Sequence, residues 1–160
     1  MNKSLSTFSL IMLLLVLSAP RMTGKLIPYT ELKLLGRGWA DTESYDKTLA
    51  RVPSRLVGHF NDIAKTTIPC TAGLAFHFST DSRSIGAVYT LDVNRVMNHQ
   101  AATGTRGLDL YLYDKASGRW LFMATHKPTA GLAQTADFGN FGMKLDGSYH
   151  DFLLYLPLYD

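Results

Sequence analysis

Apolar and polar residues alternate most regularly in the second half of the chain. In LDLYLYD (108–114), leucines fall on one side, and an acid and two tyrosines fall on the other. This period of two predicts a β-strand with one face toward a core. The polar KASG (115–118) then predicts a turn in which Gly118 takes a positive φ, and RWLFMATH (119–126) predicts the returning strand.

Three other parts of the chain alternate in the same way. LAFHFST (74–80) and IGAVYTLDV (85–93) flank a polar DSRS turn, so residues 74–93 predict a second β-hairpin. ELKLL (31–35) predicts a short strand. HDFLLYLPLYD (150–160) predicts a last strand with its phenylalanine and leucines on one side.

The fold class follows from these strands and from the absence of a helical pattern in the rest of the sequence. Residues 26–69 are weakly patterned and predict loops and short strands, and the chain beyond the first 24 residues shows no convincing helical periodicity. Several short strands separated by turns predict an all-β domain, an antiparallel β-sandwich. An unpaired apolar strand invites aggregation, so we expect the strand at 150–160 to need a partner strand that this chain lacks.

Residues 1–24 differ in character from the rest. Lys3 precedes the apolar run FSLIMLLLVLSAP, which ends in small residues. This order predicts a secretory signal peptide over residues 1–24, a β domain over residues 25–160, and a secreted or periplasmic location. An uncleaved membrane anchor is the alternative. The uncharged run from 4 to 20 has 17 residues, at the lower limit for a bilayer crossing, so we expect no stable anchor.

Part of the positive net charge of the chain comes from the predicted signal peptide. The whole sequence has 16 basic and 13 acidic residues, a formal net charge of +3. Removal of Lys3 and Arg21 leaves 14 basic residues and a net charge of +1. No cluster of lysines or arginines remains, so we expect no nucleic-acid partner.

Residues suited to chemistry are sparse. Cys70 is the single cysteine, which excludes an internal disulfide and predicts a small buried side chain. The five histidines lack metal-ligand spacing, and no loop has the pattern of a calcium or phosphate site. Asp81-Ser82 superficially resembles the Gly-Asp-Ser block of some esterases, but its neighbours predict a turn. We therefore expect no catalytic residue, metal or cofactor in this chain.

Aromatic side chains offer one more possibility, because β-sandwiches that bind sugars use flat aromatic platforms beside acids and amides. The chain offers Trp39, Tyr111, Tyr113 and Tyr155 for that role. Tyr111 and Tyr113 share a strand face with Asp109, and that face is either exposed or covered by another sheet or domain. Trp120 follows the inward phase of its strand and is predicted to lie in the core.

Three motifs together resemble a known family. They are GLDLY (107–111), GRW (118–120) and LYLPLY (154–159). In order and spacing they are similar to the N-terminal GxDLY domain that precedes SGNH-hydrolase-type esterase domains in bacteria, over roughly residues 30–160. The resemblance implies a jelly-roll-like β-sandwich. It also implies a following α/β domain, in the same polypeptide, that carries the esterase Ser, Gly, Asn and His.

The resemblance also bears on individual residues. It marks a family motif of structural importance, made of Gly107, Asp109, Leu110, Tyr111, Gly118 and Trp120. We expect Gly107 to adopt an unusual φ at the end of the 94–107 connection, and Asp109 to fix a strand end or loop through backbone amides. Asn98 and His99 in that connection are candidates for a lip that faces a hydrolase domain or substrate.

Two functions stay open at this point. The leading hypothesis is a non-catalytic module of an exported esterase acting on acylated carbohydrate, supporting a C-terminal SGNH hydrolase domain. Because the catalytic blocks are absent, this chain is predicted to be inactive alone and to stop before that domain. The alternative is a free-standing carbohydrate-binding sandwich that uses Tyr111, Tyr113 or Trp39. A third reading, that the chain is itself an esterase, depends on Ser82.

Overall fold

The structure is a computed structural model that describes residues 24–39, 42–45, 47, 49–138 and 148–160. The alternating stretch at 108–126 forms the predicted hairpin, with β4 (Asp109–Asp114) and β5 (Arg119–Thr125) in antiparallel register. Gly118 has the predicted positive φ of 67°. The Asp114 carboxylate accepts hydrogen bonds from Ser117 Oγ (2.6 Å) and two backbone N–H groups, which lowers the pKa of Asp114.

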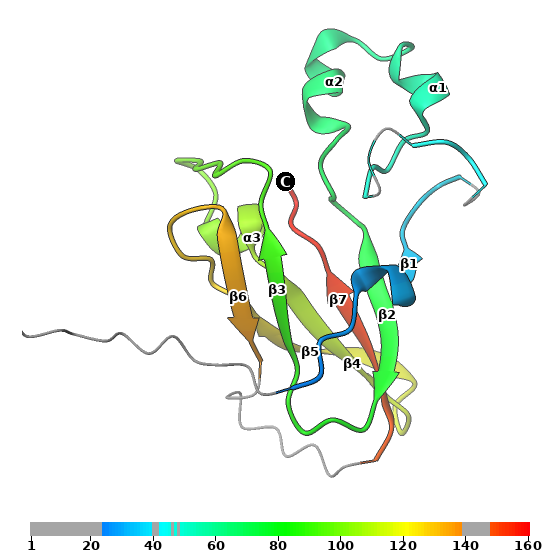
Figure 1. Ribbon diagram of the computed structural model, residues 1–160, viewed down its shortest axis with the longest axis vertical. Helices are drawn as coiled ribbons and strands as arrows, with labels where there is room; N and C mark the ends of the chain where they lie inside the picture. The colour runs from blue at the N-terminus through cyan, green and yellow to red at the C-terminus, as the bar shows by residue number, and fades with distance from the viewer. Residues whose placement is uncertain (1–23, 40–41, 46, 48, 139–147) are drawn as a thin grey trace, which may run out of the picture.

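The hairpin belongs to a five-stranded antiparallel sheet in the order β1-β2-β7-β4-β5. Its other strands are β1 (Lys33–Leu35), β2 (Ala75–Thr80) and β7 (His150–Tyr155). β7 lies between β2 and β4, so Leu154 is paired with Phe76 on one side and Leu110 on the other (Figure 1). The prediction that the last strand lacks a neighbour is therefore wrong.

A second sheet contains β3 (Gly86–Thr90) and β6 (Ala133–Asp137), which pair with each other. The strands predicted within 74–93 exist, but the predicted hairpin is wrong, because β2 and β3 lie in different sheets. Both edges of β2 are already paired, with β1 and with β7. The chain after β2 therefore crosses to the other layer, where β3 lies in front of the larger sheet (Figure 1).

The hydrophobic core lies between the two sheets. Its buried members are Leu108, Leu110, Ala124, Ala136, Phe138, Phe152 and Leu154. Phe152 stacks on Phe78 with ring centroids 5.6 Å apart, and Ala87 and Tyr89 of β3 pack against the same cluster. Burial of each large apolar side chain contributes about 1.5–3 kcal/mol. The sandwich of two antiparallel sheets is confirmed, while the jelly-roll likeness stays a prediction.

The described residues include short helices, so the prediction that the chain beyond residue 24 contains no helix is wrong. They are η1 (Tyr29–Glu31), α1 (Ser54–Val57), α2 (Asp62–Thr67) and α3 (Ala102–Arg106). None of the helices in the described ranges has the length and apolarity needed to cross a bilayer. The predicted signal peptide falls almost entirely outside the described residues. Cys70 is buried, as predicted.

A β-bulge changes the direction of the side chains in β5. Leu110 pairs with Ala124, but Tyr111 pairs with Phe122, so Met123 is an extra residue in the ladder. Successive side chains of a strand point to opposite faces of the sheet. Because β5 has one extra residue, the side chains before Met123 point to the face opposite to the one that simple alternation predicts. Trp120 consequently lies opposite Tyr113 and is 38% exposed. The prediction that Trp120 lies in the core is wrong.

Gly107 joins α3 to β4 at a point of close backbone contact. Its φ of −78° is ordinary, so the prediction of an unusual φ is wrong. A Cβ at this position would lie 2.3 Å from the Thr103 carbonyl oxygen and 2.6 Å from the His126 carbonyl oxygen. Both neighbours are backbone atoms that side-chain rotation cannot move. The glycine is therefore required by space and not by backbone conformation.

Gly107→Ala is expected to destabilise the chain by about 2–3 kcal/mol, because the added methyl group forces α3 and the end of β5 apart. Gly58→Ala is the matched control, since its Cβ would meet nothing within 4 Å and its φ is −64°. The control should be neutral or stabilising by up to about 1 kcal/mol. Urea denaturation of both variants measures the difference, and equal midpoints would contradict the steric account.

Candidate functional site

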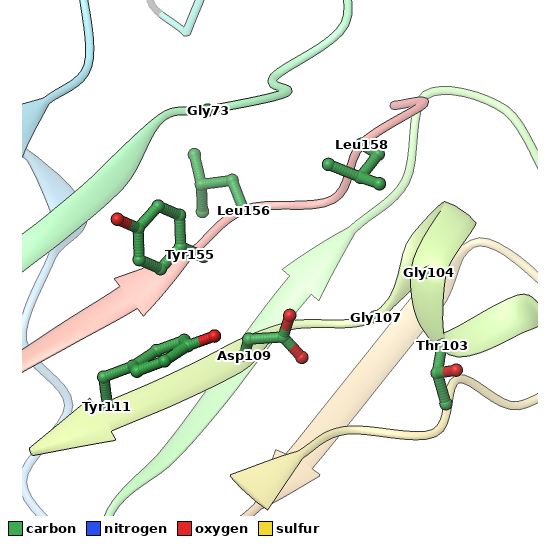
Figure 2. Close-up of a pocket in the computed structure, with 9 residues that line it drawn as sticks. All are labelled: Gly73, Thr103, Gly104, Gly107, Asp109, Tyr111, Tyr155, Leu156 and Leu158. Atoms are coloured by element: carbon green, nitrogen blue, oxygen red, sulfur yellow. The ribbon is translucent and has the colours of Figure 1, made fainter. Parts of the chain in front are cut away.

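A surface pocket of about 160 Å³ opens where β4 and β7 meet α3 (Figure 2). It is lined by Gly73, Thr103, Gly104, Gly107, Asp109, Tyr111, Tyr155, Leu156 and Leu158. We call it the motif pocket, because three of these residues, Gly107, Asp109 and Tyr111, belong to the motif singled out in the sequence. One water molecule needs only about 10–15 Å³ of such space, so the pocket has room for the end of a side chain or for part of a small ligand.

The chain that follows β7 forms one wall of the motif pocket and is held there by backbone hydrogen bonds. The Leu156 N–H donates to the Leu74 carbonyl (2.9 Å), and the Tyr159 N–H donates to the Thr105 carbonyl (3.1 Å). The Thr71 hydroxyl donates to the Pro157 carbonyl (2.6 Å). Residues far apart in the sequence therefore fix the shape of this wall before any ligand arrives.

Asp109 is the single charged residue among those that line the motif pocket. Its side chain is partly buried, and no hydrogen bond or ion pair from the described residues reaches its carboxylate. The backbone-amide partners expected from the sequence are thus not found in this part of the chain. In Figure 2 the carboxylate points into the pocket, and the Tyr111 hydroxyl points toward the same side.

The other motif residues are divided between different places. Leu110 is 3% exposed and belongs to the core, and Gly118 forms the hairpin turn. Trp120 lies on the outer face of the larger sheet, the face away from β3 and β6, where its ring is 5.2 Å from that of Tyr113. The motif therefore contributes separately to the core, to a turn and to the pocket.

The outer face of the larger sheet carries a cluster of aromatic side chains. We call it the aromatic face, and its members are Tyr111, Tyr113, Trp120, Phe122 and Tyr155. The Tyr111 ring lies 5.5 Å from both Phe122 and Tyr155, at interplanar angles of 72° and 71°. Phe122 is 56% exposed and Tyr155 is 37% exposed. Tyr111 and Tyr113 lie on one face of β4, as alternation predicts, whereas the place of Phe122 beside them does not follow from alternation, because the bulge reverses its phase.

Asn98 and His99 lie on an exposed turn closed by the Met97–Gln100 bridge, and do not line the motif pocket. Asn98 Oδ1 and His99 Nδ1 are 3.0 Å apart. Their role as a lip stays a prediction. From the same connection, Thr103 and Gly104 do line the pocket, and neither residue belongs to a pattern that would predict this from the sequence.

A serine, a histidine and an acid meet on the outer face, but in the wrong order for catalysis. The Asp151 carboxylate accepts a hydrogen bond from Ser79 and lies 3.8 Å from His77 Nε2. Activation of a serine requires the histidine to stand between the serine and the acid. Ser82, the other serine considered, donates its backbone N–H to Thr80 Oγ1 (3.0 Å), as a turn residue does.

The described residues contain no group of three or more His, Cys, Asp or Glu side chains that could hold a metal ion.

A network of hydrogen-bonded polar side chains lies beneath α3. The Tyr89 hydroxyl donates to the Arg106 carbonyl (3.0 Å) and lies 2.9 Å from His126 Nδ1. Arg106 is 6% exposed, its guanidinium donates to Asn94 Oδ1, and its Nε has no partner in the described chain.

Burial shifts the pKa values of two side chains in this network, Tyr89 and His126. It raises the pKa of Tyr89 to about 12, and lowers the pKa of His126 below its ordinary value, an effect partly offset by a hydrogen bond with the Thr135 backbone. A neutral imidazole is therefore preferred at this position in the folded protein.

Two comparisons with known proteins bear on this β-sandwich and its motif. Residues 27–160 match the GxDLY family, described as the N-terminus of Esterase_SGNH_hydro-type, and the chain belongs to this family. A protein described as a GDSL-like lipase from Bacteroides ovatus ATCC 8483 has a similar crystal structure, with a TM-score of 0.70 and 29% identity. The match covers 84% of this chain and 37% of that protein. Comparison with curated proteins gave no match.

The lowered pKa of His126 predicts a stability that depends on pH. Between the folded pKa and the unfolded value of about 6.5, the unfolded chain binds more protons, so this histidine removes stability as pH falls below neutrality. His126→Asn retains a polar atom near the position of Nδ1 for Tyr89 and cannot titrate. Urea midpoints at pH 7.5 and pH 5.0 should fall less in the variant than in the parent. Equal falls would contradict the assignment.

Proposed function

We propose that this chain is the non-catalytic N-terminal module of an exported SGNH-type ester hydrolase. In this proposal it supports a hydrolase domain that follows it in the same polypeptide, and helps to shape the access of acylated carbohydrate to that domain. A jelly-roll arrangement and an N-terminal signal peptide belong to the same proposal.

The observation that carries the proposal is the placement of the family motif. Gly107, Asp109 and Tyr111 line a surface pocket whose lining offers a carboxylate and phenol groups and contains no cysteine, serine or histidine. Such a site suits recognition better than ester cleavage. The family description supports an esterase context, since it places this domain at the N-terminus of an SGNH-type protein.

The share of the Bacteroides ovatus relative that this chain matches also supports a hydrolase partner. This chain corresponds to 37% of the Bacteroides ovatus relative, so most of that relative has no counterpart here. The relative is described as a lipase of the GDSL-like type, and we extend to this chain only the expectation of a hydrolase partner. Loops and surfaces near such a partner are the places where a supporting module affects function.

The nucleotide sequence beyond the codon for Asp160 tests the partnership directly. We expect it to encode a Gly-Asp-Ser or Gly-x-Ser block of a hydrolase domain, either in frame or after a frameshift. Sequencing of the genomic region supplies the result. Unrelated sequence over the following several hundred codons would count against the proposal.

The purified chain alone is expected to hydrolyse acetyl esters no faster than buffer, because Ser82 and Ser79 both lack an activating histidine geometry. Release of p-nitrophenol from p-nitrophenyl acetate measures this. Ser82→Ala is the matched variant and should behave as the parent does. Turnover by the parent that disappears in Ser82→Ala would show instead that the chain is an esterase in its own right.

A further inference from the structure

The aromatic face and the motif pocket form one continuous surface. Tyr111 and Tyr155 belong to both, since they line the pocket and their rings contact each other across β4 and β7. Figure 2 shows both rings on the side of the sheet that faces away from β3 and β6. The surface therefore combines exposed aromatic area with one carboxylate at its edge.

Exposed aromatic side chains in such number need an explanation. Phe122, Trp120 and Tyr155 are respectively 56%, 38% and 37% exposed, and they come from β5 and β7, the two strands that flank β4 in the larger sheet. Soluble domains seldom expose contiguous apolar area unless that area binds something. Aromatic residues are also the side chains most enriched at the centres of protein interfaces.

The angles between the aromatic rings indicate whether this surface suits a protein partner or a polysaccharide. A sugar ring stacks on an open, flat aromatic face. The rings here are instead packed edge to face: Tyr111 meets Phe122 at 72°, and Trp120 meets His77 at 89°. Edge-to-face packing is the arrangement of aromatic clusters in cores and interfaces. The geometry thus favours a surface that another protein domain covers.

The charge of the motif pocket indicates what that domain supplies. The Asp109 carboxylate is partly buried, it has no hydrogen-bond partner among the described residues, and no cation lines the pocket. A carboxylate that is covered without a partner is costly. An arginine satisfies it best, because a guanidinium binds a carboxylate through two N–H groups and stacks on phenol rings such as those of Tyr111 and Tyr155.

We propose that the aromatic face and the motif pocket are the docking surface for the hydrolase domain, and that an arginine of that domain enters the pocket and pairs with Asp109. This inference rests on the proposed function, because it needs a hydrolase domain in the same polypeptide. It adds the surface on which that domain lies, and the residue that anchors it.

The test uses the polypeptide that continues through Asp160 into the hydrolase region, with a protease site between the two parts that is cut after folding. Asp109→Asn is expected to raise the Kd between the parts about tenfold or more, and to remove most of its dependence on salt. Phe122→Ser is expected to raise the Kd about fivefold. Isothermal titration calorimetry at low and high salt measures both effects.

Matched controls separate docking from folding. Asp81→Asn removes an exposed carboxylate, and Val88→Ser removes a 62% exposed apolar side chain from β3, on the other layer. Both controls should leave the Kd unchanged. Asp109→Asn should leave the urea midpoint of this chain unchanged or raise it slightly, because the carboxylate makes no bond within the described residues and its partial burial is costly. A structural role for Asp109 would instead lower that midpoint.

The outcomes distinguish the two proposals. If the cut parts do not associate, the proposed function fails, and the docking surface fails with it. If they associate, and Asp109→Asn and Phe122→Ser bind like the parent, the docking surface is wrong and the proposed function survives. If this chain alone is retarded in polysaccharide gels, and Tyr111→Ala abolishes the retardation, the surface binds sugar, and the docking proposal is overturned.

Discussion

The position of β7 in the middle of the larger sheet is the constraint on which the rest of the structure depends. Its backbone pairs with β2 on one edge and with β4 on the other, so the last described strand holds together segments that precede it by about 40 to 80 residues. Phe152 and Leu154 point from it into the core, while Tyr155 points to the opposite side and touches Tyr111. Because side chains alternate along a strand, the pairing that builds the core also sets the aromatic face.

The sequence allowed the strands to be predicted better than their partners. Alternation of apolar and polar residues located β1, β2, β3, β4, β5 and β7. Pairing depends on which edges are already occupied, and that information is not local, so the expected hairpin at 74–93 was wrong. The β6 strand was missed because AQTAD has small or polar residues where strands usually carry β-branched or aromatic ones.

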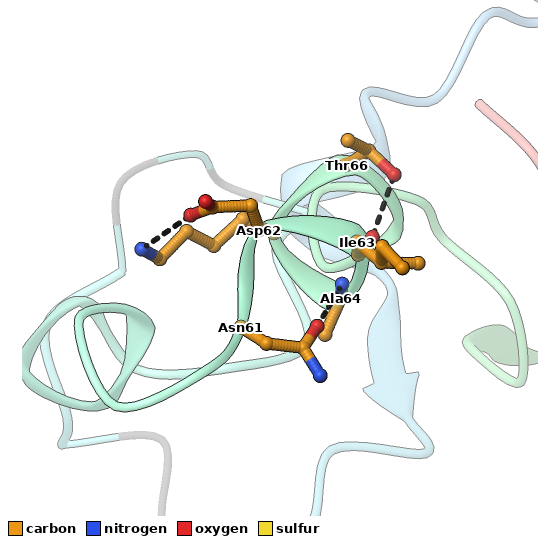
Figure 3. Close-up of polar contacts among 6 residues, drawn as sticks. Asn61, Asp62, Ile63, Ala64 and Thr66 are labelled. Atoms are coloured by element: carbon orange, nitrogen blue, oxygen red, sulfur yellow. Dashed lines mark hydrogen bonds and ion pairs between the residues drawn. The ribbon is translucent and has the colours of Figure 1, made fainter.

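The short helix α2 shows a different limit of the same approach. Its sequence, DIAKTT, has no apolar stripe, and Ile63 is 82% exposed, so helical periodicity could not reveal it. Local hydrogen bonds stabilise it instead: Asn61 Oδ1 accepts from the Ala64 N–H (2.8 Å), and Lys65 pairs with Asp62 (3.1 Å) (Figure 3). An Asn at the N-cap followed by an Asp in the first turn is a capping signal that could have located the start of this helix.

The family motif joins two kinds of residue that the sequence alone could not separate. Gly107 is determined by packing, because any side chain there would strike the carbonyl oxygens of Thr103 and His126. Asp109, two residues later, pairs through its backbone with β5 and β7, but its carboxylate makes no bond within the described residues and points into the pocket. Partial burial of a carboxylate without a partner costs free energy, and the arginine of the proposed docking would offset this cost. The close approach at Gly107 fixes the start of β4, and that fixed start presents Asp109 at the rim of the aromatic face. In the proposed docking, the glycine supplies the rigidity of this segment and the acid is the group that the partner domain recognises.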